Sequence, residues 1–107
     1  MLPKPGSPVR GSRSGRPIMA LLDLLGRRWS LRILWELRGG DAATFAELRE
    51  RCDAMSPSVL NLRIAELRDA GIIDHRDGGY RLTEEGKILL VSLAPLTDWA
   101  KRWTRRM

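Results

Sequence analysis

The chain has 107 residues, which is enough for one domain with a single core and too few for two. Its 19 Lys and Arg residues outnumber 13 Asp and Glu residues, and the net charge of +6 favours nucleic acid as a partner, although basic residues also serve solubility alone. The single cysteine excludes an intrachain disulfide and a cysteine-based zinc site, and no apolar run approaches the roughly 20 residues that cross a bilayer.

Residues 1–15 have the composition of a flexible basic tail. They contain three prolines, three glycines and three basic residues, and no acidic residue. We predict that the folded domain occupies residues 16–107. The sequence leaves open whether the tail contacts DNA phosphates or is only flexible.

Two short helices follow, each ended by glycine. Pro17 suits the first position of a helix, and Gly26 ends the apolar repeat behind it. That repeat consists of Ile18, Leu21, Leu22 and Leu25. The second helix is predicted to bury one face up to about Arg38, before Gly39 and Gly40. Its apolar positions are Trp29, Ile33, Leu34 and Leu37, and we expect Trp29 and Trp35 in a core or an interface.

The next two helices carry clear start signals. Thr44 with Glu47 three residues later predicts a capping box and a short third helix with Phe45, Leu48 and Cys52 on one face. After a tight connection, Ser56 caps a fourth helix that begins at Pro57, where proline loses no hydrogen bond. This helix is predicted to run to about Ala70, before Gly71. Its buried positions are Leu60, Ile64 and Leu67.

A short hairpin and a C-terminal helix complete the pattern. Residues 72–76 and 80–82 flank a turn at Asp77-Gly78-Gly79, which is typical of an antiparallel hairpin. Thr83 then caps a last helix, which Pro95 is expected to kink or to split into two. The fold class expected is mainly α with a small β-hairpin, a winged helix-turn-helix with a C-terminal dimerisation helix.

An apolar stripe of heptad type runs along the C-terminal helix and is predicted to form the dimer interface. Its members are Leu89, Leu93, Leu96, Trp99, Ala100 and Trp103. The alternative is that this helix belongs to the core of one chain.

The exposed face of the fourth helix is the candidate DNA reader. Ser58, Asn61 and Leu62 suit contacts to base edges in a major groove. Arg63 is placed to clamp a phosphate or an acidic neighbour, and the amides at Ser56 add a phosphate site. The full set of candidate DNA-binding residues is Ser56, Ser58, Asn61, Leu62, Arg63, Arg68, Arg76 and Arg81, the last two flanking the hairpin turn. Singly, each residue also has a purely structural or solvating role open to it.

Four segments resemble the HxlR-type winged-helix regulators, which are relatives of the MarR group. They are LLDLLGRRWSLRILWEL, TFAELRERC, MSPSVLNLRIAELRDAGII and YRLTEEGKILL, within residues 17–103. The resemblance implies a homodimeric transcriptional regulator, expected to be a repressor, that binds a pseudo-palindromic operator through Ser56, Ser58, Asn61 and Arg63.

Two departures from the family pattern stand out. Many members have a redox-sensing cysteine before the proline that opens the first helix, and this chain has Arg16 there. Cys52 lies instead on the third helix, where we expect a half-buried structural thiol. The hairpin is also shorter than is usual in the family.

The competing functions are an enzyme and a protein-interaction module. The one histidine and the one thiol have no predicted catalytic partners, and no glycine-rich phosphate loop is present, so we expect no enzyme and no metal or cofactor. Exposed Leu62 keeps open a winged helix that binds another protein. The partners expected are double-stranded DNA and a second copy of the chain, with any small-molecule effector unknown and no membrane. We expect a cytoplasmic, prokaryotic protein that associates with the nucleoid when bound to DNA.

Overall fold

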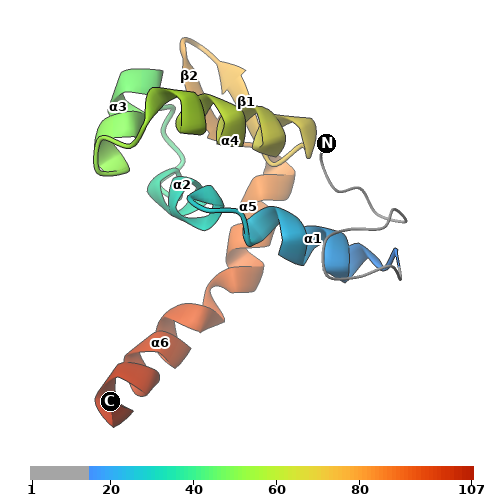
Figure 1. The fold of residues 1–107 in the computed structure, drawn as a ribbon, viewed down its shortest axis with the longest axis vertical. Coiled ribbons are helices and arrows are strands. Elements are labelled where there is room, and N and C mark those ends of the chain that lie inside the picture. The colour runs from blue at the N-terminus through green and yellow to red at the C-terminus, as the bar shows by residue number, and fades with distance from the viewer. Residues whose placement is uncertain (1–14) are drawn as a thin grey trace.

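The computed structural model describes residues 15–107, and all but the last residue of the expected basic tail lies outside that range. Figure 1 shows a group of helices with one hairpin at its upper edge, and the C-terminal helix extending away from them. The elements are α1 (Pro17–Leu25), α2 (Ser30–Glu36), α3 (Phe45–Arg51), α4 (Pro57–Asp69), β1 (Ile73–Arg76), β2 (Gly79–Leu82), α5 (Glu84–Leu93) and α6 (Pro95–Arg106). The predicted class, mainly helical with one small hairpin, is confirmed.

The helix starts follow from the capping residues. Thr44 Oγ1 accepts a hydrogen bond from the Glu47 backbone N–H at 3.1 Å, and Glu47 Oε1 accepts one from the Thr44 N–H at 2.9 Å, which completes the capping box. Thr83 Oγ1 accepts from the Gly86 N–H at 3.1 Å in the same way. Each predicted cap is therefore present.

α2 is shorter than the sequence pattern predicts. Trp29 lies outside the helix as its N-cap, with a φ of 79°, a left-handed conformation that is uncommon for a residue with a side chain. At the other end the Leu37 N–H bonds to both Ile33 O and Leu34 O at 3.2 Å, so the last turn tightens and the helix ends at Glu36. The buried face continues to Leu37, in agreement with the prediction, whereas the regular helix ends two residues before the expected Arg38.

The hairpin has a two-residue turn. β1 and β2 pair antiparallel, with Ile73 opposite Leu82, and Asp77 and Gly78 both have positive φ, as a type I′ turn requires. Tyr80 also exchanges two backbone hydrogen bonds with Ala43, at 2.7 and 2.9 Å, so the segment before α3 covers part of the edge of β2.

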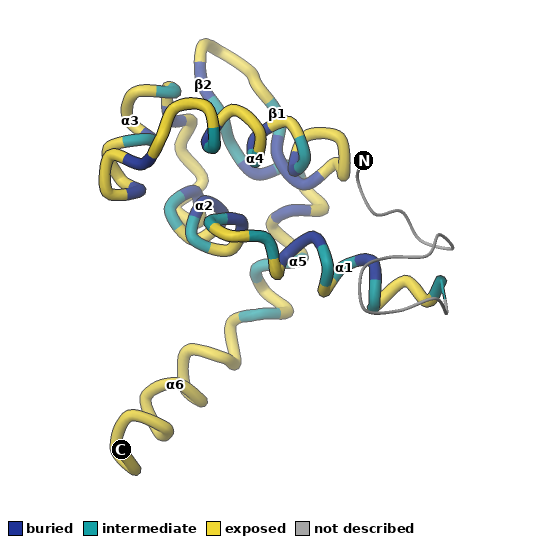
Figure 2. Tube along the Cα trace, in the orientation of Figure 1, coloured by how far each residue is buried: buried dark blue, intermediate teal, exposed yellow. Residues whose placement is uncertain are grey.

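The core lies where α2, α3, α4 and the hairpin meet, and α1 covers one side (Figure 2). The largest fully buried side chains are Ile33, Leu34, Leu37, Leu48, Leu60, Leu67 and Ile73. Pro95 lacks the N–H that would continue α5, and the chain divides there into two helices. Every residue of α6 is exposed. Among residues 15–107, no helix has the length and apolarity needed to span a bilayer.

Candidate nucleic-acid interface

α4 presents one continuous exposed face. Leu60, Ile64 and Leu67 are buried beneath it, as predicted. The exposed residues of α4 are Pro57, Ser58, Asn61, Leu62, Ala65, Arg68 and Asp69. Ser58, Asn61, Leu62, Ala65 and Arg68 are here called the α4 face, and the carboxylate of Asp69 lies at the C-terminal end of the helix. The Leu62 side chain is 53% exposed, which is unusual for leucine in a helix whose other leucines are buried. The face therefore combines a hydroxyl, an amide, a guanidinium and apolar groups, a set that suits the edges of bases.

The start of α4 is exposed and polar. Ser56 Oγ accepts from the Val59 backbone N–H at 3.4 Å and lies 3.0 Å from Ser58 Oγ. The first amides of this 13-residue helix carry the positive end of its dipole, next to two hydroxyl groups. The free N–H groups at this end can donate hydrogen bonds to a phosphate oxygen.

Of the two partners expected for Arg63, a DNA phosphate or an acidic neighbour, the structure shows the acidic neighbour. Its side chain is 17% exposed, Nε donates to Arg28 O at 2.7 Å, and Nη1 donates to Glu66 Oε1 at 2.9 Å. Two of its three nitrogens are thus engaged inside the protein. As a direct DNA contact Arg63 remains only a prediction.

Glu66 connects α4 to α1. Its second carboxylate oxygen is paired with the guanidinium of Arg27, which is also 3.1 Å from Asp23 Oδ2. All of these side chains are at most 17% exposed. The chain Asp23–Arg27–Glu66–Arg63, here called the α1–α4 ion network, fixes the orientation of α4 through charge-assisted hydrogen bonds. The sequence patterns did not identify it. The local signals were the i,i+4 pair Asp23–Arg27 and the i,i+3 pair Arg63–Glu66.

Arginines also brace the turn between α3 and α4. Asp53 and Ala54 both have left-handed backbones, with φ of 59° and 53°. Arg49 donates to Met55 O at 2.7 Å and to Ala54 O at 3.3 Å, and Arg32 Nη2 donates to Arg51 O at 2.7 Å. These bonds satisfy carbonyls that the turn leaves without helix partners. The turn is consequently held by side chains as well as by its own backbone.

The hairpin carries balanced charges. Arg76 is 3.9 Å from Asp74, and Arg81 is 3.6 Å from Asp74 and 3.9 Å from Asp77. Arg76 is exposed and Arg81 is half-buried, and pairs as long as these contribute little, so both guanidiniums are available to a stronger partner. The two carboxylates, however, offset the two arginines, and the hairpin adds less positive potential than its arginines alone suggest.

The predicted dimerisation residues divide into two groups. Leu89 and Leu93 on α5 are half-buried, and Leu89 packs against the core, as the alternative of a core helix required. The other four, here called the α6 stripe, are exposed: Leu96, Trp99, Ala100 and Trp103. The rings of Trp99 and Trp103 stack with centroids 5.7 Å apart, and each side chain is about half exposed.

A family model, the HxlR-like helix-turn-helix, matches residues 24–107. The chain belongs to the HxlR-like helix-turn-helix family. The HTH-type transcriptional regulator YvaP of Bacillus subtilis is 31% identical over 90 residues, which cover 77% of this chain and 82% of YvaP. The family and such relatives are transcriptional regulators rather than enzymes, in agreement with the prediction.

Solved structures of similar proteins have the same winged-helix fold. Quinone-bound YodB from B. subtilis matches this HxlR-like chain with a TM-score of 0.73 and 29% identity, over 79% of this chain and 96% of YodB. A possible HxlR family transcriptional factor from Thermoplasma volcanium matches with a TM-score of 0.71 and 31% identity, over 83% of this chain and 85% of that protein. A regulator described as MarR family, from Enterococcus faecalis, matches with a TM-score of 0.72 and 25% identity, over 83% of this chain and 86% of that protein. The winged helix-turn-helix prediction is confirmed.

The single thiol of this HxlR-like regulator lies in the core. The Cys52 side chain is fully buried rather than half-buried as expected, and burial raises its pKa. A thiol that is both protonated and inaccessible is a poor nucleophile. Cys52 therefore serves packing.

Proposed function

We propose that this HxlR-like transcriptional regulator binds double-stranded DNA as a homodimer and represses transcription from an inverted-repeat operator. The observation that carries the proposal is the α4 face, which the rest of the described fold leaves uncovered while the α1–α4 ion network holds the helix rigid. A rigid helix with polar groups on its outer side is the form in which helix-turn-helix proteins enter the major groove.

The residues of the face divide the recognition between them. Asn61 can pair bidentately with adenine, and Leu62 can contact a thymine methyl group. Ser58 and Arg68 add hydrogen bonds to bases or phosphates, and the amides at Ser56 hold a phosphate at the start of the helix. Arg76 and Arg81 approach the phosphates beside the neighbouring minor groove.

The homodimer joins through the α6 stripe. Trp99 and Trp103 expose large apolar surfaces on a helix that nothing in residues 15–107 covers, and such surfaces mark association sites. A two-fold dimer with its α4 helices about 34 Å apart reads two half-sites one DNA turn apart.

The alternative is that the α4 face binds a protein. Leu62 favours it, because a half-exposed leucine on a helix face is a typical anchor for a partner groove. DNA and protein partners differ in their response to salt, because only DNA releases many condensed counterions on binding.

The test is selection of bound duplexes from a random-sequence pool, followed by titration of the selected site at several salt concentrations. We expect steep salt dependence and a selected site with inverted symmetry. Asn61→Ala should reduce the free energy of binding to the selected site by about 1–3 kcal/mol and leave non-sequence-specific DNA binding unchanged. Arg76→Ala should reduce the salt slope by about 0.9. Arg105→Ala, which removes the same charge from α6, is the control. Absent or salt-independent DNA binding would refute the proposal and favour the protein partner.

The dimer is tested separately by light scattering. Trp103→Glu should give monomers, because it places a charge in the α6 stripe. Arg105→Glu changes the charge of the same helix without entering the stripe and should remain dimeric. An unchanged mass for Trp103→Glu would show that the interface lies elsewhere.

A further inference from the structure

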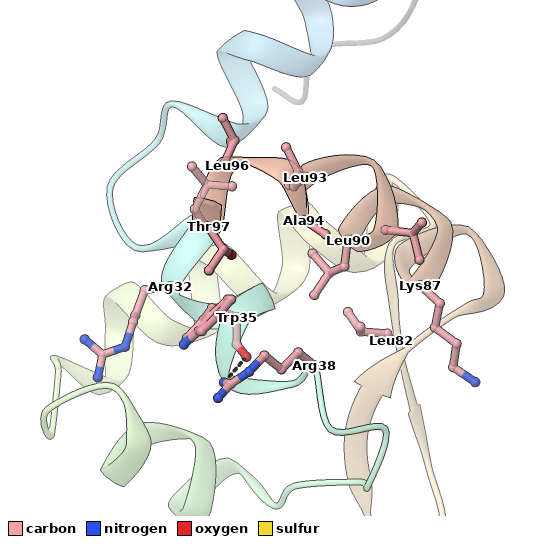
Figure 3. Close-up of a pocket in the computed structure, with 12 residues that line it drawn as sticks. Arg32, Trp35, Arg38, Leu82, Lys87, Leu90, Leu93, Ala94, Leu96 and Thr97 are labelled. Carbon is pink, nitrogen blue, oxygen red and sulfur yellow. Dashed lines mark hydrogen bonds between the residues drawn. The ribbon is translucent and has the colours of Figure 1, made fainter. Parts of the chain in front are cut away.

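An apolar groove lies between α2 on one side and α5 and α6 on the other (Figure 3). Its volume is about 700 Å³, within the range of small-molecule sites. None of its lining residues belongs to α4 or to the hairpin turn, so it is separate from the proposed DNA surface. We propose that this groove, here called the α2–α5 groove, binds an amphipathic organic anion, with a ring or chain in the groove and a carboxylate or sulfonate at its rim.

The inner surface of the groove suits the apolar part of such a ligand. Trp35 lines it from α2, Leu82 from β2, and Leu90 and Val91 from α5. The Trp35 side chain is 46% exposed and Val91 73% exposed, so covering them removes apolar surface from water. Nothing in the described chain provides that cover.

The rim of the groove is positive. Arg32, Arg38 and Lys87 line it, and none of the lining residues is acidic. Arg32 is occupied by Glu36 and Asp53, at 2.9 and 3.2 Å. The two others remain for a ligand.

Arg38 and Lys87 lie at the mouth of the groove. The Arg38 guanidinium lies 3.9 Å from the centre of the Trp35 ring and donates to Trp35 O at 2.9 Å, which fixes it there and leaves its other nitrogens to an anion. Lys87 is exposed and extends from the first turns of α5 on the other side. An anionic group at the mouth meets a cation from either wall.

The same charges disfavour a second copy of α6 as the occupant. α6 carries four basic residues, Lys101, Arg102, Arg105 and Arg106, against the single acidic Asp98. Placing this helix along a rim that carries Arg38 and Lys87 brings like charges together, which costs free energy. Of the α6 stripe, Leu96 lines the groove, whereas Trp99, Ala100 and Trp103 do not. A dimer joined through Trp99 and Trp103 therefore overlaps a ligand in the groove only at Leu96.

The test uses two fluorescent probes with the full chain. 8-Anilinonaphthalene-1-sulfonate carries the proposed anion, and N-phenyl-1-naphthylamine has the same rings without a charge. We expect saturable binding of the sulfonate at one site per protomer. Lys87→Met should weaken it by about threefold to fivefold, the range of an exposed ion pair, and leave the neutral probe unchanged. Arg105→Met is the control, because it removes a charge outside the groove.

A second variant tests the location. Ala94→Phe should fill the groove and abolish binding of both probes, with Val91→Phe as the substitute if circular dichroism shows that Ala94→Phe does not fold. Sulfonate binding that neither Lys87→Met nor the filling variant changes overturns the proposal, since the probe then binds elsewhere. An equal loss of both probes in Lys87→Met removes the selectivity for anions. Loss of dimer mass in the filling variant, with neither probe bound by the parent protein, identifies the groove as an interface between copies and also overturns it. Loss of DNA binding alone bears on the proposed function and not on the groove.

Discussion

Replacing Glu66 by alanine should destabilise the domain more than the loss of an exposed carboxylate such as that of Glu50. The side chain is 13% exposed and pairs with both Arg27 and Arg63, so its removal leaves two guanidiniums, each 17% exposed, without their shared partner. Breaking a fully buried pair costs about 3–5 kcal/mol. Arg27 keeps Asp23 and Arg63 keeps Arg28 O, so we expect the free energy of unfolding to fall by about 2 kcal/mol.

Urea denaturation followed by tryptophan fluorescence measures this change. A loss of about 2 kcal/mol lowers the melting temperature of a domain of this size by roughly 8–16 °C. Glu50→Ala, at an exposed position on α3, is the control and should change stability by less than about 0.5 kcal/mol. A double-mutant cycle of Glu66→Ala with Arg63→Met should show coupling of at least about 1 kcal/mol. If Glu66→Ala behaves like Glu50→Ala, the α1–α4 ion network does not hold α4, and the account of its rigidity is wrong.

Three further predictions concern other parts of the fold. Gly86→Ala should lower the free energy of unfolding by about 1–3 kcal/mol in urea, although alanine favours helices, because its Cβ would overlap Ile72 O; an unchanged value would contradict that packing. Cys52 should react with iodoacetamide only in denaturant, and rapid labelling of the native protein would refute its burial. Because burial raises the pKa of Cys52 in the folded state, the contribution of this thiol to the free energy of unfolding should be complete below the ordinary thiol pKa and decline above it. Hydrogen bonds from Thr44, of which that of the backbone N–H has the largest effect, lower the pKa of Glu47. Glu47 therefore stabilises the fold above the ordinary glutamate pKa and loses that effect as the pH falls through the lowered value. An NMR titration of Glu47 with an ordinary midpoint would exclude the capping box in solution.

Most helix boundaries could be predicted because their signals are local. The capping box at Thr44 and the Ser56-Pro57 start depend on residues within three positions of each other, and Pro95 acts on its own helix. α2 itself was predicted, but its first residue was not, because the start of the helix depends on the left-handed backbone of Trp29, a conformation that no local pattern indicates.

The site was predictable to a similar extent. The α4 face follows from helical periodicity, which assigns each position to the core or to solvent. The α1–α4 ion network does not, because Arg27 and Glu66 are 39 positions apart and Arg63 reaches the carbonyl of Arg28 from a distance of 35 positions. Such pairs arise only when the helices have packed. The sequence therefore allows two roles for Arg63, and its engagement inside the protein depends on how the helices pack.

The isolation of α6 has a thermodynamic consequence. The helix has 12 residues, none of them buried, and a helix of that length is only marginally stable in water by itself. In the proposed dimer, the order of this segment and the association of the chains form one linked equilibrium, with protein concentration as its variable. Amide hydrogens of α6 should accordingly exchange faster as the solution is diluted, while those of α2 and α4 keep their protection. Dilution should therefore unfold α6 alone, whereas urea unfolds the whole domain.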